Sequence, residues 1–165
     1  MNKVTIETKL TLDDFVKANY ILLFQKPTTK LLLLVAFLMI VLPVALAISG
    51  TTPYSLVQSL IGIGLIGFYL LSTYLTARKS YNAIPGLKDT LTYEFTSEQL
   101  VCFAGSSSSQ STWDKVYKVT EIKHFILLWR SRQIVNVLPK RDITREQLAA
   151  IKGMIGSNHV KNNMR

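Results

Sequence analysis

Few residues of this chain have side chains suited to nucleophilic chemistry. Cys102 is the single cysteine, and His124 and His159 are the two histidines. A thiol becomes a strong nucleophile when a base lies within hydrogen-bond distance and a third group orients that base. The strand-like alternation around Cys102 and His124 gives no reason to place them together. We therefore expect a buried core thiol and a histidine at the edge of a turn, and we predict no catalytic residues.

Metal and nucleotide sites are also not indicated. The cysteine and the two histidines show no clustered ligand spacing. Residues 62–67 match the pattern GxGxxG, but a dinucleotide site needs that pattern between a strand and a helix of a parallel sheet. Here the pattern lies inside a long apolar run. We therefore expect no metal, no cofactor and no enzyme activity.

That apolar run is the strongest feature of the sequence. Residues 31–77 contain no Lys, Arg, Asp, Glu or His, and a Gly-Thr-Thr-Pro break divides them into segments 31–49 and 54–77. Helices of these lengths reach roughly 28 and 36 Å, against a hydrocarbon core of about 30 Å. The run predicts a hairpin of two transmembrane helices. A secretory signal peptide is the less favoured interpretation, because a patterned region precedes the run and a second apolar segment follows at once.

Charges beside the run predict its orientation. Lys26 and Lys30 precede the first segment, Arg78 and Lys79 follow the second, and the connection between the segments is uncharged. Basic residues favour the cytoplasmic side of a membrane. We therefore expect both termini in the cytoplasm.

Small and hydroxyl-bearing side chains line one face of the second apolar segment at helical spacing. They are Ser55, Ser59, Gly62 and Thr73. Such residues let two helices approach closely in a membrane. We expect this face to pack against the first helix of the hairpin, with homodimerisation along the same face as the alternative.

The regions on both sides of the hairpin carry the patterns of a folded domain. Within residues 1–26, a short strand pattern precedes an amphipathic helix that starts at a capping-box pair, Thr11 and Asp14. This helix is expected either to dock on its own domain or to lie in the membrane interface. Residues 88–156 alternate polar and apolar positions in short runs that predict six strands.

Further local signals lie within residues 88–156 and after them. Trp113 and Trp129 are expected in the core, and Gly105 with the four serines that follow it predicts a flexible loop. A capping box at Thr144 starts a closing helix, which we expect to end at Gly156. Residues 157–165 are expected to form a flexible tail.

These elements predict one α+β domain that is split in sequence by the membrane hairpin. Seven antiparallel strands followed by a capping helix is the element order of a pleckstrin-homology-like (PH-like) barrel. The comparison concerns architecture and does not identify a function.

Three segments of the domain resemble a known family. Trp-Asp-Lys-Val occupies residues 113–116, an apolar strand covers residues 124–129, and Leu-Pro-Lys-Arg at residues 138–141 precedes the last helix. In order and spacing, after a membrane hairpin, they resemble the bacterial YcxB-like family. The resemblance implies a small inner-membrane protein with two spans and a PH-like cytoplasmic domain. It implies no established activity and transfers no catalytic residue.

Positive charge is the remaining signal, with a formal net charge of +9 at pH 7. A basic side chain that reaches an anionic leaflet contributes on the order of 1 kcal/mol. The candidate residues for such a surface are Arg78, Lys79, Lys118, Lys140, Arg141 and Arg145.

This charge favours a non-catalytic, membrane-anchored interaction module that presents a basic domain to anionic lipid headgroups or to a protein partner. The alternative is a small oligomeric membrane component of transport, stress or immunity type, which acts through its helices while the domain regulates it. Nucleic-acid binding is not expected, because no recognition motif accompanies the charge.

Overall fold

The chain divides into two compact units. The computed structural model describes residues 3–105, 107–132 and 134–164, so the ends of the predicted first segment and tail, and Ser106 of the predicted loop, lie outside the described residues. Unit 1 consists of Met1–Phe15 and Tyr81–Arg165, and unit 2 consists of Val16–Ser80. The two ends of the chain therefore belong to the same unit, although a long helical segment separates them in sequence.

The first sheet of unit 1 joins the two ends of the chain. Its four antiparallel strands are, in spatial order, β1 (Val4–Lys9), β2 (Thr90–Phe95), β3 (Gln99–Ala104) and β4 (Ser107–Thr112). In β1, Ile6 is buried opposite Tyr93 of β2. The alternation of the first residues thus supplies one face of a shared core, as expected for a half-buried strand.

The serine-rich stretch after Gly105 is not a flexible loop, so that prediction is wrong for its described residues. Gly105 takes a positive φ of 56° at the turn, and residues 107–109 belong to β4, which pairs with β3. Backbone hydrogen bonds to a neighbouring strand do not require apolar side chains, and an edge strand tolerates polar ones. Local propensity is therefore overridden here by the partner strand.

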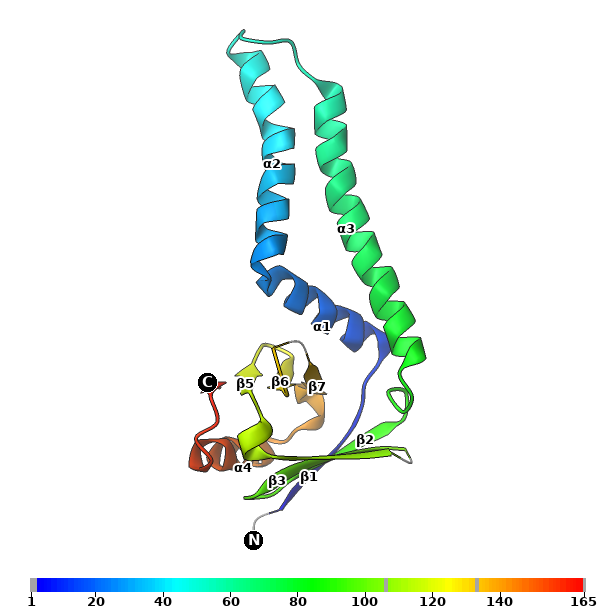
Figure 1. Ribbon diagram of the computed structural model, residues 1–165, viewed down its shortest axis with the longest axis vertical. Helices are drawn as coiled ribbons and strands as arrows, with labels where there is room; N and C mark the ends of the chain where they lie inside the picture. The colour runs from blue at the N-terminus through cyan, green and yellow to red at the C-terminus, as the bar shows by residue number, and fades with distance from the viewer. Residues whose placement is uncertain (1–2, 106, 133, 165) are drawn as a thin grey trace. The chain divides into compact units, whose positions relative to one another are not determined.

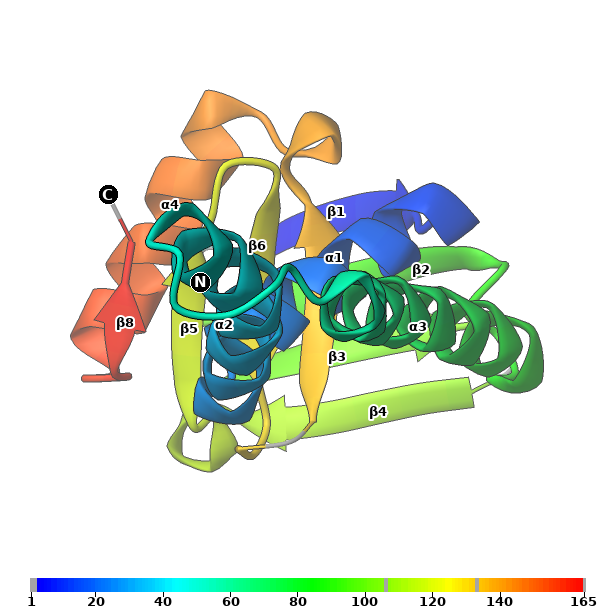
Figure 2. The same cartoon turned by 90° about the horizontal axis from the view of Figure 1, so that it is seen from above.

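The second sheet lies in the later part of the chain. It contains β5 (Lys118–Glu121), β6 (Phe125–Trp129), β7 (Val135–Pro139) and β8 (Asn162–Asn163), in the spatial order β7-β6-β5-β8 (Figure 2). β8 pairs with β5 in parallel. The predicted flexible tail thus contributes a strand, and Val160 just before it is buried, which explains why this segment is ordered.

The described strands form two separate sheets and no closed barrel. Two single-turn 3₁₀ helices connect their parts: η1 (Trp113–Lys115) leads from β4 into β5, and η2 (Lys140–Asp142) follows β7. The barrel that the sequence predicts is therefore replaced by two four-stranded sheets, accompanied by a C-terminal helix.

That C-terminal helix, α4 (Arg145–Ser157), starts as predicted. Thr144 and Gln147 form the reciprocal hydrogen bonds of a capping box, and Ile151 and Ile155 bury the apolar face of the helix. The expected terminator is wrong, because Gly156 lies inside α4. The left-handed conformation that ends many helices occurs three residues later, at His159, with a φ of 52°.

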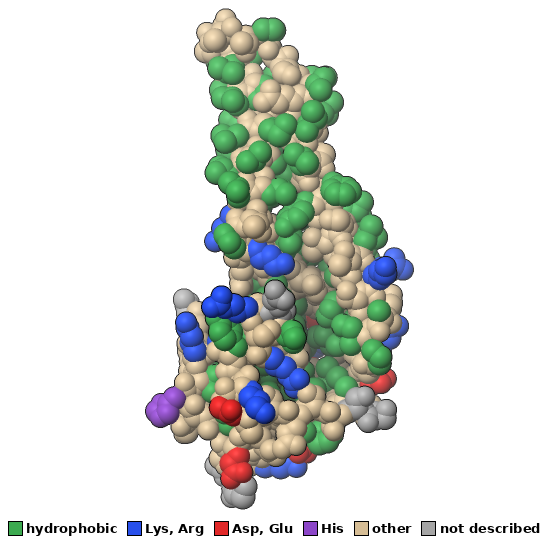
Figure 3. Space-filling view, in the orientation of Figure 1, with side chains coloured by type: hydrophobic (Ala, Val, Ile, Leu, Met, Phe, Trp, Pro, Cys, Tyr) green, Lys and Arg blue, Asp and Glu red, His purple; other side chains and the backbone are tan. Residues whose placement is uncertain are grey.

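Three further helices connect the two parts of unit 1 (Figure 1). They are α1 (Leu12–Gln25), α2 (Pro27–Ile48) and α3 (Leu56–Ala83). α2 and α3 are long and apolar enough to cross a membrane. α2 starts before the predicted segment, because Pro27 suits the first turn of a helix. α3 ends after the predicted segment, because it continues past Arg78. On the face drawn in Figure 3, hydrophobic side chains cover most of their length.

Close packing joins α2 to α3. A Cβ at Gly62 would lie 2.8 Å from the carbonyl oxygen of Ala36, so only glycine fits this approach. Ala36 and Ser59 are buried as well. Nearer the start of α2, the hydroxyls of Thr29 and Tyr69 are 2.9 Å apart. Small residues and one hydroxyl pair therefore hold the hairpin together, as expected in an apolar medium.

Candidate functional site

Basic side chains of unit 1 gather at the two ends of the second sheet. One end lies beside η2, where Phe125 is paired with Pro139; the other lies where Lys118, Trp129 and Val135 are cross-strand neighbours. We call the first the paired end: Lys140, Arg141 and Lys152 with the carboxylates of Asp14, Glu121 and Asp142. We call the second the open end: Lys115, Tyr117, Lys118, Trp129, Arg132 and Ile134.

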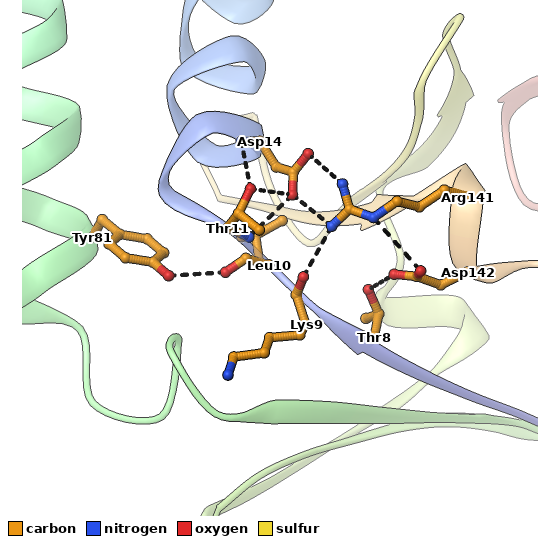
Figure 4. Close-up of polar contacts among 8 residues, drawn as sticks. All are labelled: Thr8, Lys9, Leu10, Thr11, Asp14, Tyr81, Arg141 and Asp142. Carbon is orange, nitrogen blue, oxygen red and sulfur yellow. Dashed lines mark hydrogen bonds and ion pairs between the residues drawn. The ribbon is translucent and has the colours of Figure 1, made fainter.

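A two-pronged ion pair joins Arg141 to Asp14 in the paired end (Figure 4). Nη1 of Arg141 donates to Oδ1 of Asp14 at 2.8 Å, and Nη2 donates to Oδ2 at 2.7 Å. Such a two-pronged contact matches the planar guanidinium to the carboxylate. Asp14 is only 6% exposed, whereas the Arg141 side chain is 50% exposed. The ion pair is therefore a buried anion held by a cation at the surface.

Local hydrogen bonds complete the environment of Asp14. Its Oδ2 accepts from the backbone N–H of Thr11 at 3.0 Å and from the Thr11 hydroxyl at 2.6 Å, and its own N–H donates to that hydroxyl. This is the predicted capping box. Burial alone would raise the pKa of the Asp14 carboxyl, but the hydrogen bonds from Arg141 and Thr11 outweigh it and lower that pKa below its usual value.

Arg141 and its neighbour also hold the end of β1. Nη2 of Arg141 donates to the carbonyl of Lys9 at 3.1 Å, and the Thr8 hydroxyl donates to Oδ2 of Asp142 at 2.5 Å. Close by, the Tyr81 hydroxyl donates to the carbonyl of Leu10 at 2.9 Å (Figure 4). Residues 8–10, shortly before the chain leaves unit 1, are thus hydrogen-bonded to η2 and to Tyr81, where the chain returns to unit 1.

Two lysines share one acid in the rest of the paired end. Nζ of Lys140 lies 2.5 Å from Oε1 of Glu121, and Nζ of Lys152 lies 3.2 Å from Oε2. The Glu121 side chain is only 11% exposed. β5, η2 and α4 are therefore tied together through one carboxylate.

A cavity of about 260 Å³ adjoins the paired end. It is lined by Lys140, Ile143, Thr144, Arg145 and Leu148. Lys140 already contacts Glu121, and the capping box uses two backbone N–H groups at the start of α4. Arg145 is exposed and has no ion pair within the part of the chain that the structure describes, so it is the one cation of this cavity without a carboxylate partner there.

The open end has a different composition. Nζ of Lys118 lies 4.6 Å from the centre of the Trp129 ring, in a cation–π contact. Tyr117 is 43% exposed and Ile134 is 59% exposed. Arg132 and Lys115 are exposed as well. Among the described residues, neither Lys118 nor Arg132 forms an ion pair, and Asp114, next to Lys115, is exposed.

The other predicted residues fall in several places. Arg78 and Lys79 are exposed on α3, in unit 2. On the small-residue face, Ser59 and Gly62 are buried, Thr73 is half-buried, and Ser55 precedes the helix and is exposed.

The two tryptophans have different environments. Trp113 is 2% exposed, stacks on Phe95 and donates its indole N–H to the carbonyl of Thr96 at 2.9 Å. Trp129 is half-buried at the open end.

Cys102 and His124 lie in different sheets of unit 1. Cys102 is half-buried in β3 opposite Tyr93, and burial raises the pKa of its thiol. His124 is exposed in the β5–β6 connection. No group of three or more potential metal ligands occurs among the described residues. Because a thiolate is the reactive form of cysteine, the environment of Cys102 disfavours nucleophilic attack.

Comparison with known proteins gives one match. Residues 95–155 match the family model of the YcxB-like protein. Over these residues the chain is similar to the YcxB-like family. Neither the curated proteins nor the solved structures contain a match to it. The YcxB-like segment extends from the last residue of β2 into α4, and it therefore includes all of the open end and every residue of the paired end except Asp14.

Sequence reasoning missed the two arrangements that distinguish these ends. Asp14 was assigned to local helix capping, and its partner Arg141 is 127 residues away in sequence, beyond any local pattern. The open end had a usable signal. A tight turn centred on Lys123 and His124 places Lys118 opposite Trp129, because hairpin register follows from the position of the turn.

Proposed function

We propose that the chain is a non-catalytic interaction module anchored in a membrane by α2 and α3, with unit 1 in the cytoplasm. The supporting observation is the exposure of the hairpin: only 11% of the most apolar window of each helix is buried. Water would disfavour so large an apolar surface, whereas lipid accommodates it. Lys26 and Lys30 before the hairpin and Arg78 and Lys79 after it favour cytoplasmic ends, in the inner membrane of a bacterium.

A PH-like architecture for unit 1 is part of this proposal. β1 to β7, which pair antiparallel within the two sheets and are followed by α4, have the element order of such domains. The likeness concerns layers and order, since the two sheets remain separate. It supports a binding role more than catalysis, but a fold hosts many functions, so the case for binding depends on surface charge.

That charge supports recognition of an anionic partner, either lipid headgroups or an acidic protein surface. The net charge is +9, and a domain tethered to a membrane gains from each basic side chain that reaches an anionic leaflet. The half-buried thiol of Cys102 lies in the first sheet, and the exposed His124 lies in a connection of the second, which supports a role without catalysis.

The lipid form of the proposal is tested on the full chain in nanodiscs. We would compare phosphatidylcholine alone with equal parts of phosphatidylcholine and phosphatidylglycerol, and follow hydrogen exchange of unit 1 backbone amides. Exchange should slow in the anionic nanodiscs, and high salt should remove the difference because surface charges are screened within about 10 Å at 0.1 M salt. Identical exchange in both lipids would exclude lipid recognition and leave the protein partner.

The orientation is tested with single cysteines in a Cys102→Ser background. A membrane-impermeant maleimide applied outside intact bacterial spheroplasts should label Thr52→Cys, in the connection between α2 and α3, and should not label Lys161→Cys in unit 1. Both positions are exposed in the structure. Labelling of both, or of Lys161→Cys alone, would reject the cytoplasmic location of unit 1.

A further inference from the structure

The open end combines exposed apolar side chains with basic side chains that form no ion pair among the described residues. Tyr117 and Ile134 flank the β5–β6–β7 strands at this end and are 43% and 59% exposed. Backbone hydrogen bonds keep them in place: the N–H of Tyr117 donates to the carbonyl of Trp129, and the N–H of Arg130 donates to the carbonyl of Ile134. The apolar groups are thus presented by an ordered sheet end.

Among the described residues, no carboxylate is paired with Lys118 or Arg132 at the same end. Lys118 contacts only the ring face of Trp129 among the interactions described, and Arg132 is exposed without an ion pair among the described residues. Lys115 is adjacent to Asp114, the acid of this end. At the other end of the sheet, by contrast, Lys140 and Lys152 both contact Glu121.

This combination fits one kind of partner better than others. Tyrosine and tryptophan favour the headgroup level of a bilayer, where an amphipathic ring has both apolar and polar surroundings. Lysine and arginine gain from anionic headgroups at the same level. A free anion would complement the charges but would leave Tyr117 and Ile134 exposed to water, and the membrane anchor keeps lipid headgroups near this end at all times.

We infer that the open end is a membrane-surface contact site for anionic lipid headgroups, in which Lys118 and Arg132 contact phosphates while Tyr117 and Ile134 enter the headgroup layer. The inference rests on the proposed membrane anchoring, because the hairpin keeps unit 1 near a bilayer. It goes further by assigning the contact to one end of one sheet.

Spin labels on the full chain in nanodiscs test this assignment. In a Cys102→Ser background, a label at Ile134→Cys reports on the open end, and a label at Glu98→Cys reports on the exposed β2–β3 turn. In mixed phosphatidylcholine and phosphatidylglycerol, oxygen accessibility relative to a water-soluble nickel chelate should rise several-fold at position 134 compared with phosphatidylcholine alone. It should stay unchanged at position 98.

Charge variants make the test specific. Lys118→Gln with Arg132→Gln should abolish the rise at position 134, whereas Lys123→Gln with Arg145→Gln removes the same charge elsewhere in unit 1 and should preserve it. Unchanged thermal unfolding of both double variants shows that they remain folded. A variant that unfolds early is replaced by Arg132→Gln alone, which should lower the rise by at least half.

The remaining outcomes reject the inference without rejecting the proposed function. If both double variants lose the rise equally, unit 1 responds to total charge and the open end is not the site. A rise at position 98 alone places the contact elsewhere. No rise at either position, together with slowed hydrogen exchange in anionic nanodiscs, leaves lipid recognition intact and removes the open end from it. If anionic lipid changes neither the oxygen accessibility of the labels nor the hydrogen exchange of unit 1, both the inference and the lipid form of the proposed function are wrong.

Discussion

The two ends of the second sheet carry similar positive charge and use it differently. At the paired end, Arg141 and Lys140 contact carboxylates that are nearly buried, on Asp14 and Glu121. At the open end, Lys118 and Arg132 contact no carboxylate among the described residues. Positive charge in a sequence is therefore not equivalent to positive charge at a binding surface. Two of the six basic residues that the sequence nominates are occupied by holding the fold together.

Location explains the difference. The paired end lies where β1 and the first turn of α1 meet η2. The ion pair between Arg141 and Asp14 and the hydrogen bonds from Arg141 to Lys9 and from Thr8 to Asp142 therefore join segments from opposite ends of the chain. A split domain needs such contacts, because its first strand loses the benefit of chain proximity. The open end connects only consecutive strands, β5 to β7, which their own turns already hold in register. Its side chains are not required for that task.

Replacing Arg141 by Gln should have the largest effect on stability. The change removes the guanidinium from a nearly buried carboxylate, and breaking such a pair costs 3–5 kcal/mol when both groups are buried. Because the Arg141 side chain is 50% exposed, we expect a loss of about 2 kcal/mol in the free energy of unfolding. Urea unfolding of the full chain in detergent, followed by near-ultraviolet circular dichroism, measures it.

Arg145→Gln is the matched control for Arg141→Gln. It removes the same charge four residues later, from an exposed side chain without an ion pair among the described residues, and should cost less than about 0.5 kcal/mol. Equal losses for the two variants would mean that the paired end owes its stability to something other than the contact with Asp14.

Acid should weaken the paired end through Asp14. Because the pKa of this carboxyl in the folded chain is lowered from its ordinary value of 3.8, its ionised form stabilises the fold at pH values above 3.8. That contribution is lost as the pH falls through the folded-state pKa. Asp14→Asn should therefore be less stable than the wild type at neutral pH, and the difference in melting temperature should shrink below pH 3.8. A difference that stays constant across this range would contradict the assigned role.

How much of this could be predicted depends on the distance over which each residue acts. Thr11 and Asp14 are three residues apart, so their capping box is visible in the sequence and is present in the structure. The same holds for Thr144 and the start of α4. The contact between Asp14 and Arg141 was not predicted. The capping box with Thr11 already accounts for Asp14, and nothing in the local sequence indicates a further partner.

Elements that depend on a partner strand were the least predictable. Ser107–Thr112 and Asn162–Asn163 have little intrinsic preference for strands, and β3 and β5 impose the conformation on them. The barrel was overpredicted for a related reason. Strand patterns specify which face is buried, but they do not state whether the last strand of one sheet continues hydrogen bonding into the next.

Lys140→Gln should have an intermediate effect within the paired end. Glu121 also contacts Lys152 at 3.2 Å, so one lysine remains when the other is removed. We expect each single replacement to cost about 0.5–1 kcal/mol. The double variant should cost more than the sum of the two, because either lysine alone still offsets the nearly buried carboxylate of Glu121. Strict additivity in urea unfolding would show that the two contacts are independent.

Lys118→Gln should have the smallest effect on stability and so gives the sharpest contrast between the ends. A partly exposed cation–π contact is worth about 0.5 kcal/mol, and no carboxylate among the described residues depends on Lys118. The free energy of unfolding in detergent should therefore change by no more than about 0.5 kcal/mol. A loss as large as that of Arg141→Gln would make Lys118 a structural residue. The basic residues of both ends would then stabilise the fold, through a carboxylate at the paired end and through an aromatic ring at the open end.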